Sequence, residues 1–178
     1  MALETPKYEV VTKHDGFETR HYSEMIIATT SVQADYKNSI SSGFRRIASY
    51  IFGGNDKEMK IAMTAPVISD CPSEGLDTYN ISFVMPKEHS MKDLPRANTS
   101  DVSIKSEMLG EVAVLAFGGW ATESRSMSFQ KKFAKMLQQN NIETQGGFMV
   151  AQFNSPYVLP MFRKNELMVR IIKKSSVN

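Results

Sequence analysis

The stretch "GFRRIASYIFGGNDKEMKIAMTAPV", residues 43–67, decides the fold because it holds the end of a helix, a glycine turn and an extended run. With the residues before it, the stretch predicts a helix over 36–52, since apolar residues recur there at steps of four, three and four. This stripe, which we expect to face the core, consists of Ile40, Phe44, Ile47 and Ile51. Asn38 or Ser39 can cap the start, and the glycines at 53–54 end the helix because glycine accepts a left-handed conformation.

Extended runs lie on both sides of this helix. Two precede it, at 8–12 and 17–32, and an Asp-Gly turn signal at residues 15–16 separates them. Two follow it, "KIAMTAPVIS" at 60–69 and "YNISFVMP" at 79–86. The first half therefore reads strand, strand, helix, strand, strand.

The second half repeats this order. Extended runs at 102–107 and 112–118 precede the amphipathic segment 123–141, and runs at 148–153 and 166–173 follow it. Two helices among so many hairpin strands predict an antiparallel α+β fold. Two similar halves predict a pseudo-twofold, distorted β-barrel or curved sheet of two repeats with two flanking helices.

The connection between the halves, residues 87–101, is polar but too short to be a domain boundary. We therefore expect one domain over residues 1–178, with internal repeats at about 5–90 and 100–174. A chain of 178 residues can bury a continuous apolar core.

Charge and composition exclude several classes of function. Lys and Arg number 21 against 19 acidic residues, and the basic residues form no long cluster, so nucleic acid is not an expected partner. Cys71 is the only cysteine, which excludes an intrachain disulfide and a cysteine-based zinc site. The start of the chain does not resemble a secretory signal, and no apolar run approaches the ~20 residues that cross a bilayer. The expected location is the cytoplasm.

The sequence does not offer a recognisable set of catalytic groups. Its three histidines, His14, His21 and His89, are widely spaced and form no metal-binding spacing. Cys71 has no neighbouring histidine, and the glycine pairs lack the continuation of a phosphate-binding loop. We expect a protein that is not an enzyme.

Four segments, in this order along the chain, resemble the SOUL heme-binding protein family. They are "ETPKYEVV" with "FETRHY" near the start, residues 43–67, "SFVMP" in the middle and "FNSPYVLPMFRKNEL" near the end. The resemblance covers nearly the whole chain. It implies a barrel similar to the gyrase-inhibitor-like ligand-binding domains, and cytosolic binding of heme (hemin) or another tetrapyrrole, for carriage or buffering.

The same resemblance gives His21 a role. The histidine of the "RHY" motif has been proposed as an axial heme ligand in this family, and it matches His21, which is thus a candidate for both cofactor and metal binding. A neutral imidazole is a good ligand for heme iron. Strand periodicity places His21 on the same face as Phe17 and Thr19. The alternative is a strand residue with no iron contact.

A ligand groove is predicted beside the core stripe of the first helix. A second line of residues there is small in the middle, cationic at one point and aromatic at one end: Ser41, Arg45, Ala48 and Phe52. A flat porphyrin needs a low surface, and its propionates favour a guanidinium that can bond both oxygens. The alternative is that this line is the boundary between core and solvent.

The opposite wall of the groove is implied by the resemblance to be the loop 154–165. Tyr157 and Met161, with Leu159 and Phe162, would cover the ring, and Arg163 or Lys164 would reach a carboxylate. The alternative is that the apolar side chains of this loop pack under a turn. The sequence leaves open a monomer or an oligomer linked by heme.

A second class of function is a protein-interaction module that regulates cell death. The family has been described as carrying a BH3-like segment in the second helix, which would engage a Bcl-2-type partner. Phe133 and Leu137 supply two anchors at helical spacing. The Gly-Asp pair expected after the leucine is replaced here by Gln139 and Asn140, and the same apolar face is needed to cover the sheet.

Overall fold

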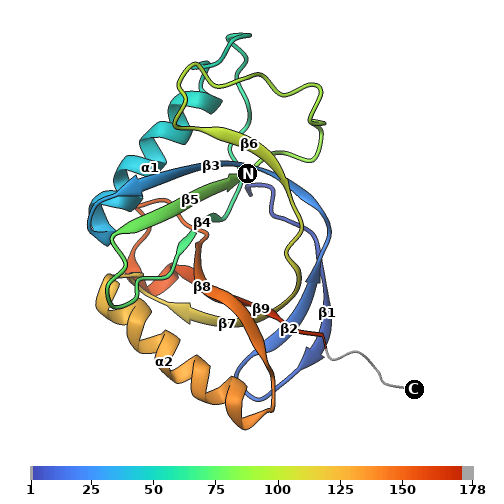
Figure 1. Ribbon diagram of the computed structural model, residues 1–178, viewed down its shortest axis with the longest axis vertical. Helices are drawn as coiled ribbons and strands as arrows, with labels where there is room; N and C mark the ends of the chain where they lie inside the picture. Colours follow the sequence, from blue (N-terminus) through green and yellow to red (C-terminus); the bar gives the residue numbers. More distant parts are fainter. Residues whose placement is uncertain (1, 174–178) are drawn as a thin grey trace.

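A computed structural model describes residues 2–173 as one curled sheet with two helices on its outer side (Figure 1). The helices are α1 (Tyr36–Ile51), α2 (Glu123–Gln139) and the short 3-10 helix η1 (Pro160–Phe162). The strands are β1 (Tyr8–Lys13), β2 (Glu18–Tyr22), β3 (Met25–Gln33), β4 (Val67–Asp70), β5 (Thr78–Val84), β6 (Ser103–Glu107), β7 (Gly110–Gly118), β8 (Thr144–Gln152) and β9 (Lys164–Ile171).

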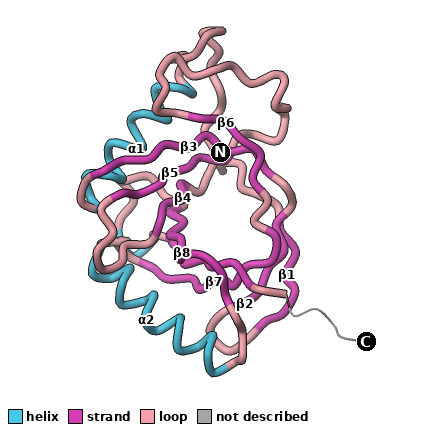
Figure 2. The backbone as a smooth tube through the Cα atoms, in the orientation of Figure 1, coloured by secondary structure: helices cyan, strands magenta, loops and turns pink. Residues whose placement is uncertain are grey.

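The sheet order makes the predicted pseudo-twofold symmetry explicit. All pairs are antiparallel, in the order β1-β2-β7-β9-β8-β4-β5-β3-β6. Without β1, exchanging each strand from β2 to β5 with its counterpart from β6 to β9 gives the same order read from the opposite edge of the sheet. The halves join through β4 and β8, and each outer strand, β2 or β6, pairs with the opposite half. Figure 2 shows the strands curling into an open barrel.

The α+β barrel prediction is thus confirmed, and β1, the predicted run 8–12, lies at one edge outside the twofold pattern. The repeat bounds of about 5–90 and 100–174 stay a prediction, and residues 1 and 174–178 of the predicted domain lie outside the described residues.

Two predicted strands differ from the structure. The run 17–32 is two strands, because β2 ends at Tyr22 and β3 begins at Met25. The run 60–69 is a strand only from Val67, because the backbone before it bonds elsewhere. The N–H of Ile61 donates to the carbonyl of Ile51, and that of Ala65 to the carbonyl of Glu4.

The first helix has the predicted stripe but a different cap. Its N-cap is Asp35, whose carboxylate accepts the N–H of Asn38 at 3.0 Å. Ser39 instead turns inward, and its hydroxyl donates to the carbonyl of Ala34. Of the predicted stripe, Ile47 and Ile51 are buried, while Ile40 and Phe44 are half-buried against the same core.

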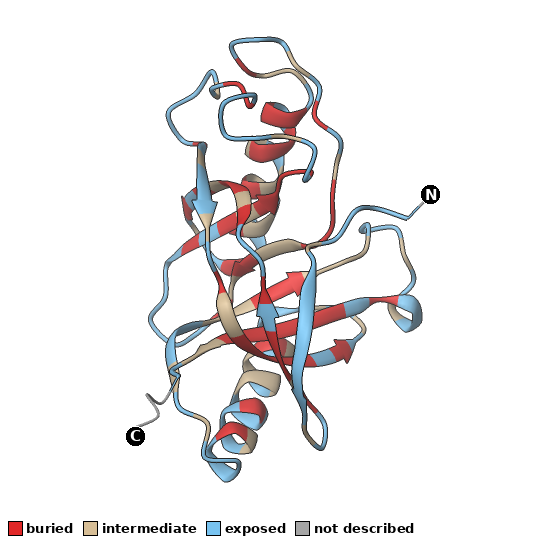
Figure 3. Ribbon diagram, turned by 90° about the vertical axis from the view of Figure 1, so that its right-hand side faces the viewer, coloured by how far each residue is buried: buried red, intermediate tan, exposed pale blue. Residues whose placement is uncertain are grey.

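Three apolar clusters fill the molecule. One lies between α1 and strands β3 and β5, and a second between α2 and strands β7, β8 and β9. The third occupies the inner face of the curled sheet. Adjacent residues of β3 show the division, since Ala28 faces α1 and Ile27 faces the interior. Figure 3 shows buried residues concentrated in the strands and on α1.

The turn after α1 is organised by a buried asparagine. The side-chain amide of Asn55 donates to the carbonyls of Tyr50 and Met59, both at 2.8 Å. Its side-chain oxygen accepts the N–H groups of Lys57 and Met59. Gly54 approaches α1 so closely that a Cβ would lie 2.5 Å from the carbonyl oxygen of Ser49. This part of residues 43–67 is therefore a structural turn.

We predict that Asn55→Ala lowers the free energy of unfolding by roughly 2–4 kcal/mol, because it leaves buried backbone groups without partners. Chemical denaturation measures this. Asn98→Ala is the matched control, since Asn98 is exposed and joins the same turn through its backbone N–H. Equal losses in both variants would contradict the role given to Asn55.

Candidate functional site

The predicted iron ligand lies on the half of the sheet that α2 covers. His21 is exposed on β2, opposite Glu9 of β1 and Glu111 of β7. Thr19, on the same face of β2, lies opposite Ala113, which packs in the core beneath α2. The predicted strand face of His21 is confirmed. Because α1 packs on β3 and β5, the structure does not bring His21 together with the flank of α1.

The flank of α1 is mostly open to solvent. Ser41, Arg45 and Phe52 are exposed, with 60% of Phe52 accessible, whereas Ala48 is buried. The guanidinium of Arg45 makes a long hydrogen bond of 3.4 Å to the hydroxyl of Ser42 one turn away. The flank therefore presents a cation and an aromatic ring that a ligand can contact.

The loop between β8 and β9 exposes large apolar side chains. Tyr157 is 94% exposed and Met161 is 77% exposed, and Leu159 and Phe162 are exposed as well. A group of apolar side chains this exposed on one short loop is unusual, and such patches commonly mark an interaction site.

Arg163 holds this loop in shape from beneath. It is buried, and its guanidinium donates to the carbonyls of Ser155, Pro156 and Val158 at 2.6–3.2 Å. The same group stacks 3.7 Å from the ring centre of Trp120. These contacts commit Arg163 to the loop itself and leave it little capacity to reach a ligand carboxylate.

Among the described residues, the hydrogen bonds and ring contacts of the loop do not reach the flank of α1. They run to Trp120 in the connection between β7 and α2, and within the loop. Lys164, the other predicted cation, lies 3.5 Å from the carboxylate of Glu166 and over the ring of Phe153. No described hydrogen bond or ring contact therefore joins the two predicted walls, and the groove between them stays a prediction.

The inner face of the sheet holds a buried ion pair that the sequence analysis did not find. Arg20 of β2 donates two hydrogen bonds of 3.0 Å to Glu166 of β9, and Glu166 is fully buried. Arg20 also donates to the hydroxyl of Tyr22 and stacks over the ring of Tyr8. Burial lowers the pKa of Arg20, but the hydrogen bonds and charge interactions with Glu166 and Tyr22 together outweigh burial and raise this pKa. Burial raises the pKa of Tyr22 to about 12.

The surroundings of Cys71 and Glu166 make these two side chains poor candidates for catalysis. Burial raises the pKa of the Cys71 thiol to about 12, so it stays protonated at neutral pH and is a poor nucleophile. Among residues 2–173, no group of three or more His, Cys, Asp or Glu side chains could hold a metal ion. Glu166, although buried, is neutralised by Arg20.

The proposed anchors for a Bcl-2-type partner lie in the core. Phe133 and Leu137 are buried beneath α2, and Phe133 packs against the rings of Phe17 and Phe148. Presenting them to a partner would require α2 to leave the sheet, and nothing in the structure supports that alternative.

One pocket was not expected from the sequence. It lies at the C-terminal end of α1 and gathers three cations, Lys57, Lys92 and Arg96, around apolar side chains. The sequence gives little indication of this pocket, because its three cations lie in polar segments that resemble a turn and a linker.

Within residues 2–173, none of the helices combines the length and the apolar character that a membrane span requires.

Comparison with known proteins confirms the resemblance. Residues 3–170 match the family model described as SOUL heme-binding protein. The chain is 34% identical to heme-binding protein 2 of Homo sapiens, over 93% of this chain and 85% of that protein.

Solved structures resemble the fold alone. A hydrolase from Listeria innocua matches with a TM-score of 0.62 at 13% identity, over 91% of this chain and 94% of that one. The EcmrR C-terminal domain matches with a TM-score of 0.63 at 8% identity, over 94% and 99%.

We predict that Arg20→Met and Glu166→Leu each lower the free energy of unfolding by roughly 3–5 kcal/mol, because each removes the bidentate partner of a buried charge. The remaining charge keeps only a more exposed partner, Lys164 for Glu166 or Glu18 for Arg20. The double variant should lose clearly less than the sum, since it removes both charges. Denaturation of the four proteins in a double-mutant cycle measures the coupling. Additive losses would show that the pair is not energetically linked.

Proposed function

The chain belongs to the SOUL heme-binding protein family, and from this we propose that it binds heme or a related tetrapyrrole reversibly, for carriage or buffering in the cytoplasm, without catalysing a reaction. The buried thiol of Cys71 and the neutralised Glu166 support a role without catalysis. A lone cysteine is consistent with a reducing compartment.

The observation that carries the proposed site is the exposed apolar loop between β8 and β9, which Arg163 holds by hydrogen bonds. Tyr157 and Met161, with Leu159 and Phe162, offer a surface for the macrocycle, and Arg163 fixes the backbone that presents them. A surface ordered before binding loses less entropy when the ligand arrives. We assign Arg163 a positioning role and not a direct contact with the ligand.

The flank of α1 supplies the second part of the proposed site. Arg45 is exposed and weakly bonded, so its guanidinium is available to a propionate. Phe52 and the small residue Ser41 offer a low surface for one edge of the ring, whereas Ala48 is buried beneath it. Because the described contacts leave the flank and the loop apart, this proposal requires the tetrapyrrole itself to bridge them.

His21 supports a second mode of contact. Its exposed imidazole can ligate iron without opening the core. On β2 it is remote from α1, so we propose that it ligates a heme at the surface of the α2 half, where a second chain can supply the other axial ligand. Glu9 and Glu111 lie opposite that position, and Glu111 is paired with Lys173 at 3.4 Å, so the surroundings offer propionates little net attraction and the iron contact would dominate. This mode corresponds to an oligomer linked by heme.

We predict that metal-free protoporphyrin binds wild type, and that replacing Tyr157, Met161 and Phe162 together by Ser weakens it at least tenfold, since apolar burial is lost. Arg45→Gln should weaken it roughly tenfold through loss of a charge-assisted bond. Fluorescence titration measures both affinities. The control is Lys132→Gln, an exposed charge on α2. No binding by wild type, or equal binding by all variants, would contradict the proposed site.

We predict that His21→Ala changes the Soret spectrum of bound hemin and abolishes any hemin-dependent oligomer, while affinity for metal-free protoporphyrin stays within about twofold because no iron contact is involved. Absorption spectroscopy and light scattering give the two readouts. An unchanged hemin spectrum would remove iron ligation by His21 and leave the loop site standing.

A further inference from the structure

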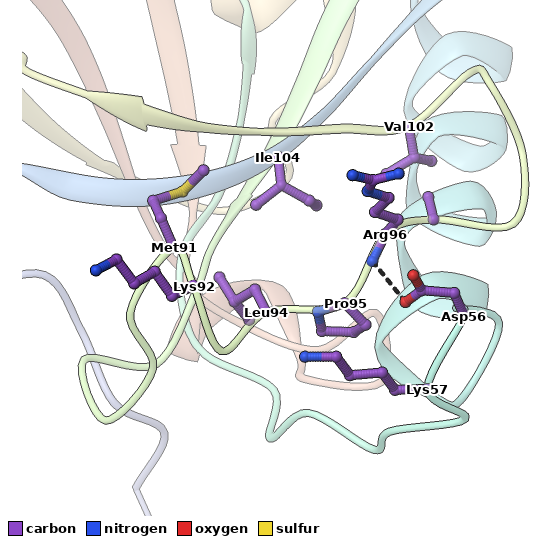
Figure 4. A pocket seen from close by; sticks show the side chains of 10 residues that line it. Asp56, Lys57, Met91, Lys92, Leu94, Pro95, Arg96, Val102 and Ile104 are labelled. Atoms are coloured by element: carbon purple, nitrogen blue, oxygen red, sulfur yellow. Dashed lines mark hydrogen bonds between the residues drawn. The ribbon is translucent and has the colours of Figure 1, made fainter.

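A pocket of about 540 Å³ lies at the C-terminal end of α1 (Figure 4). Three segments form it: the turn after the helix, the linker residues 91–97 and the start of β6. Its volume falls in the range of about 300–1,000 Å³ that small-molecule sites occupy. Its lining includes no residue from the loop between β8 and β9 and none of the four flank residues of α1, so it is separate from the proposed heme site.

The walls of this pocket are held by hydrogen bonds before any ligand arrives. The N–H of Asp56 donates to the carbonyl of Arg96, and the N–H of Arg96 donates back to the carboxylate of Asp56 at 2.8 Å. Asn55 and Ala97 form an antiparallel bridge beside them. The hydroxyl of Tyr50, buried in α1, donates to the carbonyl of Pro95 at 2.8 Å. The pocket is therefore preorganised and does not depend on a loop closing over it.

The floor of the pocket is apolar. Leu94 and Val102 are buried members of the core beneath α1, and Ile104 packs partly against the same core. Because Leu94 and Val102 are already buried, a hydrocarbon group in the pocket would gain most of its apolar contact from half-buried Ile104 and exposed Met91, which also line it.

The rim of the pocket is cationic. Lys57, Lys92 and Arg96 stand around the floor, and Asp56 is the one acidic residue of the lining (Figure 4). Asp56 is already engaged by the backbone of Arg96, and Lys57 donates to the carbonyl of Asp93 at 3.0 Å. Among the described residues, no hydrogen bond or ion pair engages the ammonium of Lys92 or the guanidinium of Arg96. Three cations beside one carboxylate favour an anionic ligand.

We propose that this pocket binds a small amphipathic carboxylate, with its hydrocarbon body on Leu94, Val102 and Ile104 and its carboxylate among Lys57, Lys92 and Arg96. The apolar floor and cationic rim match the two parts of such a molecule. The proposal is independent of heme binding, because it rests on different residues.

The test is a fluorescence titration with parinaric acid, a polyene fatty acid that brightens in apolar sites, and with its uncharged methyl ester. The pocket variant replaces Lys57, Lys92 and Arg96 together by Gln. The matched control replaces the exposed Lys131, Lys132 and Lys135 of α2 by Gln, which removes the same charge elsewhere.

We expect the acid to bind wild type at least about tenfold more tightly than the ester, and the pocket variant to lose about tenfold while the control stays within about twofold. Lys92→Gln alone, which removes no described hydrogen bond, should show a smaller loss if the triple variant unfolds. Equal losses in pocket variant and control, or equal binding of acid and ester, would overturn the proposal.

A further experiment with hemin distinguishes this pocket from the proposed heme site. Protein preloaded with hemin should bind the fatty acid with unchanged affinity, and the pocket variant should bind hemin as wild type does. Competitive displacement by hemin, with weakened hemin binding in the pocket variant, would make this the heme site and overturn the inference of a second ligand. Failure of the loop variants to affect protoporphyrin would leave the fatty-acid result untouched.

Discussion

One constraint governs the described part of the chain: a nine-stranded sheet has to bury both of its faces with two long helices. Both helices pack on the outer face, so the inner face must curl and bury itself against its own strands. The bidentate bond between Arg20 and Glu166 lies in this interior and joins β2 to β9, two strands apart in the sheet. A charged pair is tolerated there because each charge compensates the other; either one alone would be costly to bury.

The same constraint decides where function can be placed. The inner faces of α1 and α2 are committed to covering the sheet, which removes Phe133 and Leu137 from any partner surface. The interior is lined by apolar side chains and the ion pair, and the cavity beside Tyr22, Glu166 and Met168 measures only about 100 Å³, too small for a macrocycle. Ligands therefore have to bind outside the sheet interior: on the exposed flank of α1, on the loop between β8 and β9, or at the ends of the helices. Both proposed sites lie at such surface positions.

Local pattern was enough to predict the elements but not their long-range partners. The apolar stripe of α1 and the repeated strand order were readable because periodicity reflects which face is buried. The run 60–66 resembled a strand, yet its backbone bonds to Ile51 and Glu4, a choice that only the assembled fold makes. The Arg20–Glu166 pair spans 146 residues, and the pocket cations come from the turn after α1 and from the linker 91–97, so neither has a local signature. His21 was readable as a strand residue, but its distance from α1 follows from sheet order alone.

The position of the cationic pocket at the C-terminal end of α1 has a physical consequence. A helix presents partial negative charge at this end, which disfavours anions. Here the final carbonyls are already engaged: Ala48 by the N–H of Phe52, Tyr50 by Asn55, and Ile51 by the N–H of Ile61. The last turn of α1 contains no basic residue, so the cations that would offset its dipole come from the turn and the linker. Cationic side chains from outside the helix would thus have to hold an anion in this pocket, because the helix dipole repels it. Removing those cations should therefore weaken anion binding strongly.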